Sequence, residues 1–108
     1  MKKLFALLVF AGVTQLAMAA DAEIKGDAKA AQSKVAMCIG CHAIPGYKAT
    51  FPEVFLVPML GGQSAKYLES ALKAYQKGER KHPTMRDIAR GLSDQDIADV
   101  AAYYAQQK

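Results

Sequence analysis

The feature that most restricts how this chain can fold is a five-residue stretch with two cysteines and a histidine, Cys38-Ile39-Gly40-Cys41-His42. The chain has 108 residues and contains two cysteines in all. A chain of this length forms one domain. Such a small domain has a thin core and commonly relies on disulfides, a metal or another internal support. The group that the two thiols hold therefore decides what the rest of the chain packs around.

The C-x-x-C-H pattern is typical of a covalent attachment site for a c-type haem. The two thiols add to the two vinyl groups of the porphyrin, and the two intervening residues let the peptide reach both. The next residue, His42, can place its imidazole under the iron, which takes such a histidine as an axial ligand. We therefore predict one haem c, attached through Cys38 and Cys41, with His42 as an iron ligand.

Three other chemistries of the two cysteines fit the sequence less well. A redox-active dithiol normally accompanies a βαβ pattern, and the sequence shows none. A disulfide between residues three apart would close a very small loop and stabilise little. A zinc site would need both cysteines, His42 and the distant His82, a spacing that matches no usual zinc site.

The first twenty residues have the three parts of a secretory signal peptide. A basic start at Met1–Lys3 precedes the apolar run Leu4–Val13, and Ala17-Met18-Ala19 offers small residues where a signal peptidase reads. We predict that residues 1–20 are cleaved, after residue 19 or 20, and that residues 21–108 form one mature haem domain. A retained membrane anchor is the alternative, but a spanning helix needs about 20 predominantly apolar residues. Bacterial haem attachment follows export, so we expect the mature protein in the periplasm.

The mature sequence predicts an all-α domain with three main helices. Apolar residues recur at helical spacing over about 26–37, after Ser64 and after Ser93. Gly78 is a typical stop for the second helix, and Ser93 opens a capping-box pattern at the start of the third. A further short turn of helix is expected at 86–90. The four tyrosines of these regions are expected in the core or on pocket walls, namely Tyr67, Tyr75, Tyr103 and Tyr104.

The segment between the first two predicted helices, about 42–63, is long for a loop of a compact domain. It contains three prolines and three glycines, but also the apolar stretch Phe51–Leu60. Such a composition does not suit a solvated linker. We therefore expect this loop to wrap around a large apolar group inside the fold.

A haem iron that carries electrons needs a second axial ligand, for which the mature sequence offers three methionines and a histidine. Met37 adjoins the first attachment cysteine and is tied to that side of the haem. Met59 lies in the apolar loop, where packing is the simpler interpretation because methionine commonly fills gaps. His82 precedes a proline and is interpreted as an exposed loop residue. Met85, in the loop before the last helical region, can approach the iron from the side opposite His42, although the residues alone leave Met59 and His82 as alternatives.

The sequence resembles the small bacterial class I cytochromes c over nearly all of residues 26–107. The stretch Ala43–Val57 departs from that family, which often has glycine after the histidine. The shared segments are the first helix with its C-x-x-C-H ending, Pro58-x-Leu60-x-Gly62-Gln63, Tyr67-Leu68, Tyr75-x-x-Gly78-x-Arg80, Met85, and Leu92-Ser93-Asp94-x-Asp96-Ile97-x-x-Val100-Ala101-Ala102-Tyr103-Tyr104.

The resemblance implies a fold and the roles of particular residues. A class I cytochrome c has three main helices and long loops wrapped around one covalently bound haem. The methionine at the place of Met85 is the sixth ligand in that family, so His42 and Met85 are the expected iron ligands. The proline at the place of Pro58 offers its carbonyl to the ring N–H of the proximal histidine, which would fix the tautomer of His42 and raise its basicity. Leu60, in the same segment, is expected to contact the haem.

With two axial protein ligands the iron has no open position, which disfavours substrate chemistry and favours one-electron exchange. The resemblance therefore implies a periplasmic electron carrier, not an enzyme, that alternates between ferric and ferrous haem c. One alternative is a haem c subunit of a larger periplasmic oxidoreductase complex. Another is a gas or redox sensor, which requires an easily displaced Met85.

The expected partners are redox proteins that donate and accept electrons in transient contacts with a monomer. A membrane is expected to matter only through docking to a redox complex. The docking surface is expected to be small, because weak electron-transfer interfaces bury less than about 1,200 Å². Five basic residues could surround the haem edge, although the modest net charge favours ordinary solvated charge as their explanation: Lys48, Lys66, Arg80, Lys81 and Arg86. An exported chain with so few clustered charges does not suit nucleic-acid binding.

Overall fold

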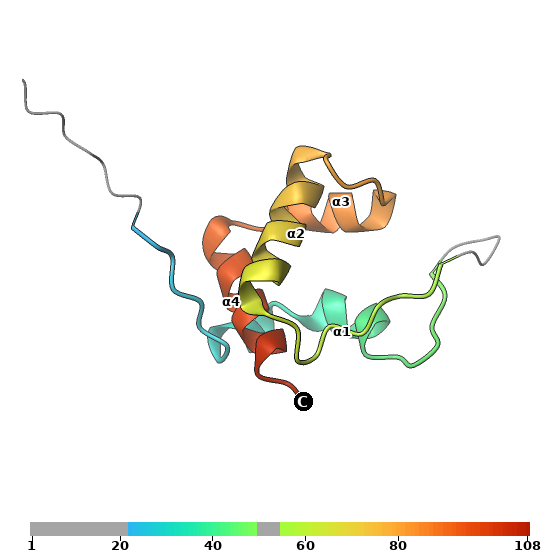
Figure 1. Ribbon diagram of the computed structural model, residues 1–108, viewed down its shortest axis with the longest axis horizontal. Coiled ribbons are helices and arrows are strands. Elements are labelled where there is room, and N and C mark those ends of the chain that lie inside the picture. Colours follow the sequence, from blue (N-terminus) through green and yellow to red (C-terminus); the bar gives the residue numbers. More distant parts are fainter. Residues whose placement is uncertain (1–21, 50–54) are drawn as a thin grey trace, which may run out of the picture.

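The computed structural model describes residues 22–49 and 55–108; the predicted signal peptide with its cleavage site, and Phe51, lie outside the described residues. The described chain is all-α, as predicted, with one 3-10 turn and four helices (Figure 1). Within this described part, no helix has the length and apolar character needed to span a membrane. In chain order the elements are η1 (Ala30–Ser33), α1 (Ala36–His42), α2 (Ala65–Lys77), α3 (Pro83–Arg90) and α4 (Asp94–Ala105).

The first predicted helix is divided in two, so its expected course over 26–37 is wrong. The carboxylate of Asp27 accepts hydrogen bonds from the backbone N–H groups of Lys29 and Ala30, at 2.8 and 3.3 Å. These bonds order the chain as it enters η1 and do not reach the break between Ser33 and Ala36. Helix α1 begins only at Ala36 and carries the whole C-x-x-C-H motif.

Helices α2 and α4 begin where the sequence predicts, each after a serine cap. The hydroxyl of Ser64 accepts from the backbone N–H of Tyr67 at 3.1 Å, and Ser93 forms the expected capping box with Asp96. Gly78 ends α2 in the left-handed conformation, with φ of 78°, which glycine adopts without steric cost. These helix starts and the stop at Gly78 depend on residues a few positions apart, which is why local sequence patterns predict them.

Helix α3 is longer than the turn expected at 86–90, because it begins at Pro83. Proline suits the first helical position, where its fixed φ is already helical and its missing N–H has no partner to lose. The preceding residue, His82, is the N-cap. Met85 is therefore in the first turn of a helix, and the prediction that it lies in the loop before that helix is wrong.

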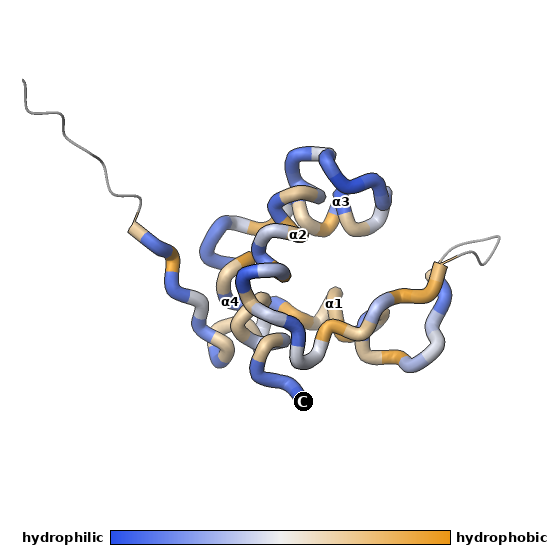
Figure 2. Tube along the Cα trace, in the orientation of Figure 1, coloured by the Kyte–Doolittle hydropathy of each residue, from blue (hydrophilic) through white to orange (hydrophobic). Residues whose placement is uncertain are grey.

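The long loop between α1 and α2 contains no helix in its described part, as predicted. Its two sides approach each other at an isolated antiparallel bridge between Lys48 and Leu56. Beside it, the N–H of Val57 donates to the carbonyl oxygen of Tyr47 at 2.9 Å. Figure 2 shows hydrophobic residues along parts of this loop next to α1. The loop therefore returns toward α1 and does not extend as a linker.

The core lies where α4 packs on η1 and on α2 (Figure 1). Gly26 brings the segment before η1 against α4, since a Cβ at this position would lie 2.1 Å from the carbonyl oxygen of Ala98. A residue with a side chain therefore cannot occupy this position without moving the backbone. The buried core cluster consists of Ala31, Val35, Leu68, Val100, Ala101 and Tyr104.

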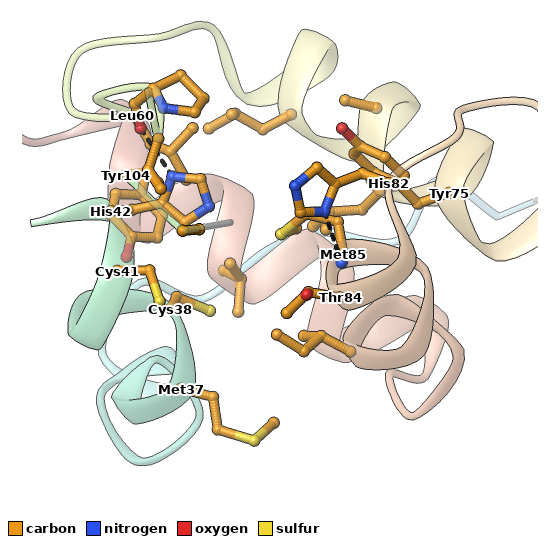
Figure 3. A pocket seen from close by; sticks show the side chains of 18 of the residues that line it. Met37, Cys38, Cys41, His42, Leu60, Tyr75, His82, Thr84, Met85 and Tyr104 are labelled. Carbon is orange, nitrogen blue, oxygen red and sulfur yellow. Dashed lines mark hydrogen bonds between the residues drawn. The ribbon is translucent and has the colours of Figure 1, made fainter. Parts of the chain in front are cut away.

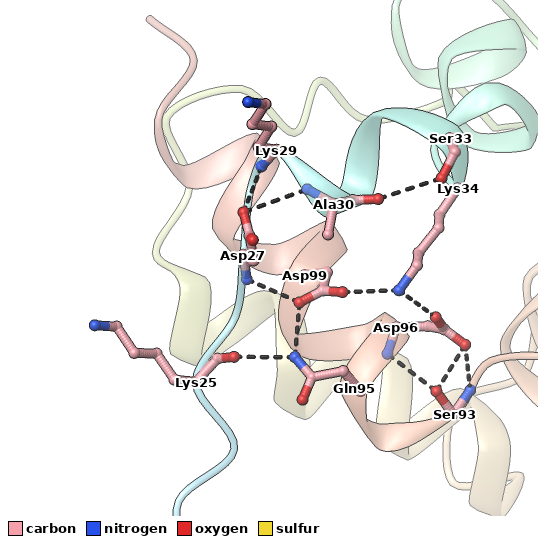
Figure 4. A network of polar contacts seen from close by, with 10 residues as sticks. All are labelled: Lys25, Asp27, Lys29, Ala30, Ser33, Lys34, Ser93, Gln95, Asp96 and Asp99. Atoms are coloured by element: carbon pink, nitrogen blue, oxygen red, sulfur yellow. Dashed lines mark hydrogen bonds and ion pairs between the residues drawn. The ribbon is translucent and has the colours of Figure 1, made fainter.

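A polar network joins α4 to the N-terminal segment (Figure 4). The carboxylate of Asp99, a residue only 2% exposed, accepts from the backbone N–H of Asp27 at 2.8 Å, and from the side chains of Lys34 and Gln95 at 2.7 and 2.8 Å. Lys34 also pairs with Asp96 at 2.6 Å. Hydrogen bonds from Lys34 are the main reason that the pKa values of Asp96 and Asp99 lie below the usual range. The same contacts raise the pKa of Lys34.

We expect Gly26→Ala to lower the free energy of unfolding by about 1–3 kcal/mol, the usual cost of adding a methyl group to a packed site. Gly91→Ala is the matched control, because its Cβ would meet the nearest atom, the carbonyl oxygen of Ile88, at an ordinary 3.5 Å. Denaturant unfolding measures both variants. Equal stability of the two would contradict the close approach at Gly26.

We expect Asp99→Asn to lower the free energy of unfolding at pH 7 by about 1.5–3 kcal/mol, since it removes the charge of a buried group and replaces one of its acceptor oxygens with an NH₂ donor. Because the folded pKa of Asp99 lies below its unfolded value of about 3.9, the stabilisation by its charge is present above that pH and is lost as the pH falls through the folded pKa. The native protein should therefore lose more stability between pH 7 and pH 3 than Asp99→Asn. Unfolding curves at the two pH values test this, and an equal loss would disprove it.

Candidate functional site

An apolar cavity lies between α1, the long loop and helices α2, α3 and α4 (Figure 3). Its volume of about 320 Å³ falls within the range of roughly 300–1,000 Å³ usual for small-molecule and cofactor sites. The structure thus brings together side chains from distant parts of the chain. All six residues that the sequence predicts for the site line this cavity: Cys38, Cys41, His42, Pro58, Leu60 and Met85.

Helix α1 presents both cysteines to the cavity. Residues three apart are neighbours on a helix surface, so Cys38 and Cys41 lie on the same face of α1 (Figure 3). Both are half-buried free thiols, which excludes the disulfide alternative in this structure. Burial, with a smaller contribution from Cys41, raises the pKa of Cys38. Two thiols on one wall are therefore available for bonds to a group in the cavity.

His42, at the end of α1, makes the hydrogen bond that the resemblance implies. Its Nδ1 lies 2.7 Å from the carbonyl oxygen of Pro58. A carbonyl oxygen only accepts, so the proton of the neutral ring is on Nδ1. The other nitrogen, Nε2, keeps its lone pair, and Figure 3 shows that side of the ring turned toward the cavity. His42 can therefore ligate a metal ion from this wall.

Met85 lies on the opposite wall, in the first turn of α3. Figure 3 shows its sulfur pointing into the cavity on the side that faces His42. The other methionines are placed differently: Met59 is 62% exposed and does not line the cavity, and Met37 lines it from α1, the helix that also carries His42. Among the described residues, Met85 is therefore the thioether that faces His42.

His82 is not the exposed loop residue that the sequence suggests, because it is half-buried and lines the cavity. Its Nδ1 accepts a hydrogen bond from the backbone N–H of Met85 at 3.4 Å. In the neutral ring the proton is then on Nε2, which leaves that nitrogen no lone pair for a metal ion. Pro83 is the sequence signal that could have located this cap, since proline favours the first helical position.

The tyrosines are divided between the cavity, the core and the surface. Tyr75 and Tyr104 line the cavity and Tyr103 packs against the core, as expected. Tyr67 is 51% exposed, so the prediction that it lies in the core or on a pocket wall is wrong.

The hydroxyl of Tyr104 is buried without a hydrogen-bond partner in the described chain, and burial raises its pKa to about 12. An unpaired buried hydroxyl is costly, so the cavity favours a ligand that offers it a polar partner.

These features fit a c-type haem. The walls are apolar, two thiols lie three residues apart on one helix, and an imidazole nitrogen faces a thioether sulfur, a ligand pair that haem iron takes in electron-transfer proteins. The buried hydroxyl of Tyr104 is one more atom that a bound group can satisfy. Neither at this cavity nor elsewhere among the described residues does a group of three His, Cys, Asp or Glu side chains lie close enough together to hold a metal ion. The zinc alternative therefore lacks a ligand set.

The chain is similar to known proteins over most of its length. The model of the family described as Cytochrome c matches residues 27–108. Cytochrome c-554(548) of Halomonas halodenitrificans is 48% identical over 86 residues, which cover 77% of this chain and 99% of that protein. Cytochrome c4 of Pseudomonas aeruginosa is 41% identical over 107 residues, which cover 99% of this chain and 49% of that protein.

A solved structure agrees with these sequence matches. Reduced recombinant cytochrome c4 from Pseudomonas stutzeri superposes with a TM-score of 0.62 at 37% sequence identity. The match covers 77% of this chain and 46% of that one. The chain therefore spans about half the length of the cytochromes c4 that it matches, and nearly the whole length of the Halomonas protein.

Proposed function

Because this chain belongs to the cytochrome c family, we propose that it is an exported carrier of single electrons whose haem iron is held between His42 and Met85. The observation that carries this proposal is the position of these two side chains on opposite walls of one apolar cavity, with both attachment cysteines beside His42.

The family determines the cofactor and the class of activity. The chain carries one haem c and is an electron carrier, not an enzyme. Haem c, when bound, supplies an iron that alternates between the ferrous and ferric states. The chain's own residues have to hold that group, keep water from it and set the energy at which it accepts an electron.

The side chains of the cavity are suited to these tasks. Cys38 and Cys41 would hold the haem covalently. The hydrogen bond to Pro58 orients the ring of His42 and keeps its Nε2 free of a proton. A thioether such as that of Met85 raises the reduction potential relative to a second histidine. With a ligand on each side, no position is left for a substrate, which agrees with electron transfer.

The place of action and the partners follow from the sequence. We infer that the mature protein works in the periplasm, because residues 1–20 have the layout of a signal peptide. Its partners are redox proteins. We infer that it meets its electron donor and acceptor transiently and as a monomer.

A second candidate is a haem c subunit fixed within a larger periplasmic oxidoreductase complex. The observation in its favour is the apolar surface of the long loop, where Ile44, Phe55 and Met59 are 45, 64 and 62% exposed. Burial of such exposed apolar side chains against a partner would be favourable. A monodisperse monomer after purification supports the carrier, whereas stable association with a catalytic subunit supports the second candidate.

We expect the purified mature protein to be coloured and to carry the added mass of one haem, because two thioether bonds survive denaturation. The double variant Cys38→Ala/Cys41→Ala is expected to carry no covalent haem, since neither bond can form. Intact mass spectrometry under denaturing conditions makes the measurement. A colourless native protein with the mass of the bare polypeptide would contradict the proposal.

We expect Met85→Ala to abolish the optical signature of methionine-ligated low-spin ferric haem and to lower the reduction potential, because axial ligands set potentials over a range of about 0.8 V. Met59→Ala is the matched control: this methionine is exposed and outside the cavity, so its loss should change neither property. Persistence of the signature in Met85→Ala would show that another residue binds the iron.

A further inference from the structure

We propose that His82 is a positioning residue for the sixth iron ligand: its ring caps helix α3 through the backbone of Met85 and so holds the Met85 thioether against displacement. This inference rests on the proposed ligation by Met85. It goes further by naming the residue that determines how firmly Met85 binds.

The contacts of His82 are those of a residue that starts a helix. Its backbone is extended, with φ of −143° and ψ of 110°, and its carbonyl oxygen accepts from the N–H of Arg86 at 2.9 Å. Its Nδ1 accepts from the N–H of Met85 at 3.4 Å, and Pro83 occupies the first helical position. One residue therefore satisfies two backbone N–H groups of the first turn, and one of these belongs to Met85 itself.

The two ends of α3 are held in different ways. At the C-terminal end Ala89 is fully buried, and the side-chain amide of Gln76 donates to the carbonyl oxygens of Ala89 and Leu92 at 2.8 Å each. At the N-terminal end, the side-chain hydrogen bond found in the described part of the chain is the one that His82 accepts from the N–H of Met85. The helix has eight residues, and helices this short are marginal without tertiary support. Loss of the cap therefore loosens the turn that carries Met85 while the far end remains docked.

The cap also separates the role of His82 from that of a ligand. While Nδ1 accepts from the N–H of Met85, the neutral ring carries its proton on Nε2, the nitrogen that Figure 3 shows on the cavity side. The ring therefore cannot hold the first turn of α3 and bind iron through Nε2 in the same tautomer. The structure assigns His82 to the backbone of Met85 and leaves the iron to the Met85 sulfur.

The test measures how readily an added ligand replaces Met85. Ferric holoprotein is titrated with imidazole while the methionine–iron optical signature is followed, in the wild type and in His82→Ala. We expect imidazole to bind His82→Ala about fivefold more tightly, the change that corresponds to loss of a typical N-cap. His82→Asn should stay within about twofold of the wild type, because the side-chain oxygen of asparagine is a preferred cap acceptor.

Ser64→Ala is the matched control. It removes the same kind of bond, in which an N-cap side chain accepts from the backbone N–H three residues on, in a helix that carries no proposed ligand. Thermal unfolding should show a loss of stability in Ser64→Ala as in His82→Ala, while imidazole affinity stays at the wild-type value. If His82→Ala does not fold, His82→Phe, which keeps a ring without an acceptor, replaces it with the same expectation.

Three results would overturn the inference: unchanged imidazole affinity in His82→Ala, an equal rise in Ser64→Ala, or a rise in His82→Asn as large as in His82→Ala.

Failure of the proposed ligation by Met85 gives a different set of results. In that case the wild type lacks the methionine–iron signature, or Met85→Ala retains it. As a further check, His82→Ala should no longer change imidazole affinity when combined with Met85→Ala, because no thioether is left to displace.

Discussion

One hydrogen bond, from Nδ1–H of His42 to the carbonyl oxygen of Pro58, joins helix α1 to the long loop and sets the chemistry of the cavity. Helix α1 has seven residues, and the described part of the loop has no helix, so neither is rigid by itself. The bond ties them together beside the attachment cysteines. The tautomer of His42 and the approach of the loop at Pro58 to helix α1 therefore depend on the same contact.

The two histidines of the chain line the same cavity, and their backbone partners give them different roles. Nδ1 of His42 meets a carbonyl oxygen, so Nε2 presents a lone pair to the cavity. Nδ1 of His82 meets the N–H of Met85, so Nε2 carries the proton. The residue type is the same in both places. The backbone group beside each ring decides which histidine can ligate iron and which one supports the other ligand.

Helix α4 keeps its charged network apart from the cofactor cavity. Asp99 ties the helix to the N-terminal segment through Lys34 and the backbone of Asp27. Val100 and Tyr104 belong to the core and also line the cavity. Successive helix positions differ by about 100° because there are 3.6 residues in each turn, so neighbours such as Asp99 and Val100 serve different sides. An acid-sensitive network can therefore hold the fold together without placing a charge against the haem site.

The sequence by itself determined the attachment motif, the starts of α2 and α4 and the stop at Gly78, because each depends on residues only a few positions apart. The resemblance to class I cytochromes c supplied the expected roles of Pro58 and Met85, which residue patterns left open. The start of α3 and the cap from His82 are also local, and Pro83 is the sequence signal that marks them. Only the tertiary structure decided the close approach at Gly26, the network around Asp99 and the position of His42 and Met85 on opposite walls of one cavity. The physical reason is that each of these depends on groups that distant segments of the chain bring together, and local spacing does not contain that information.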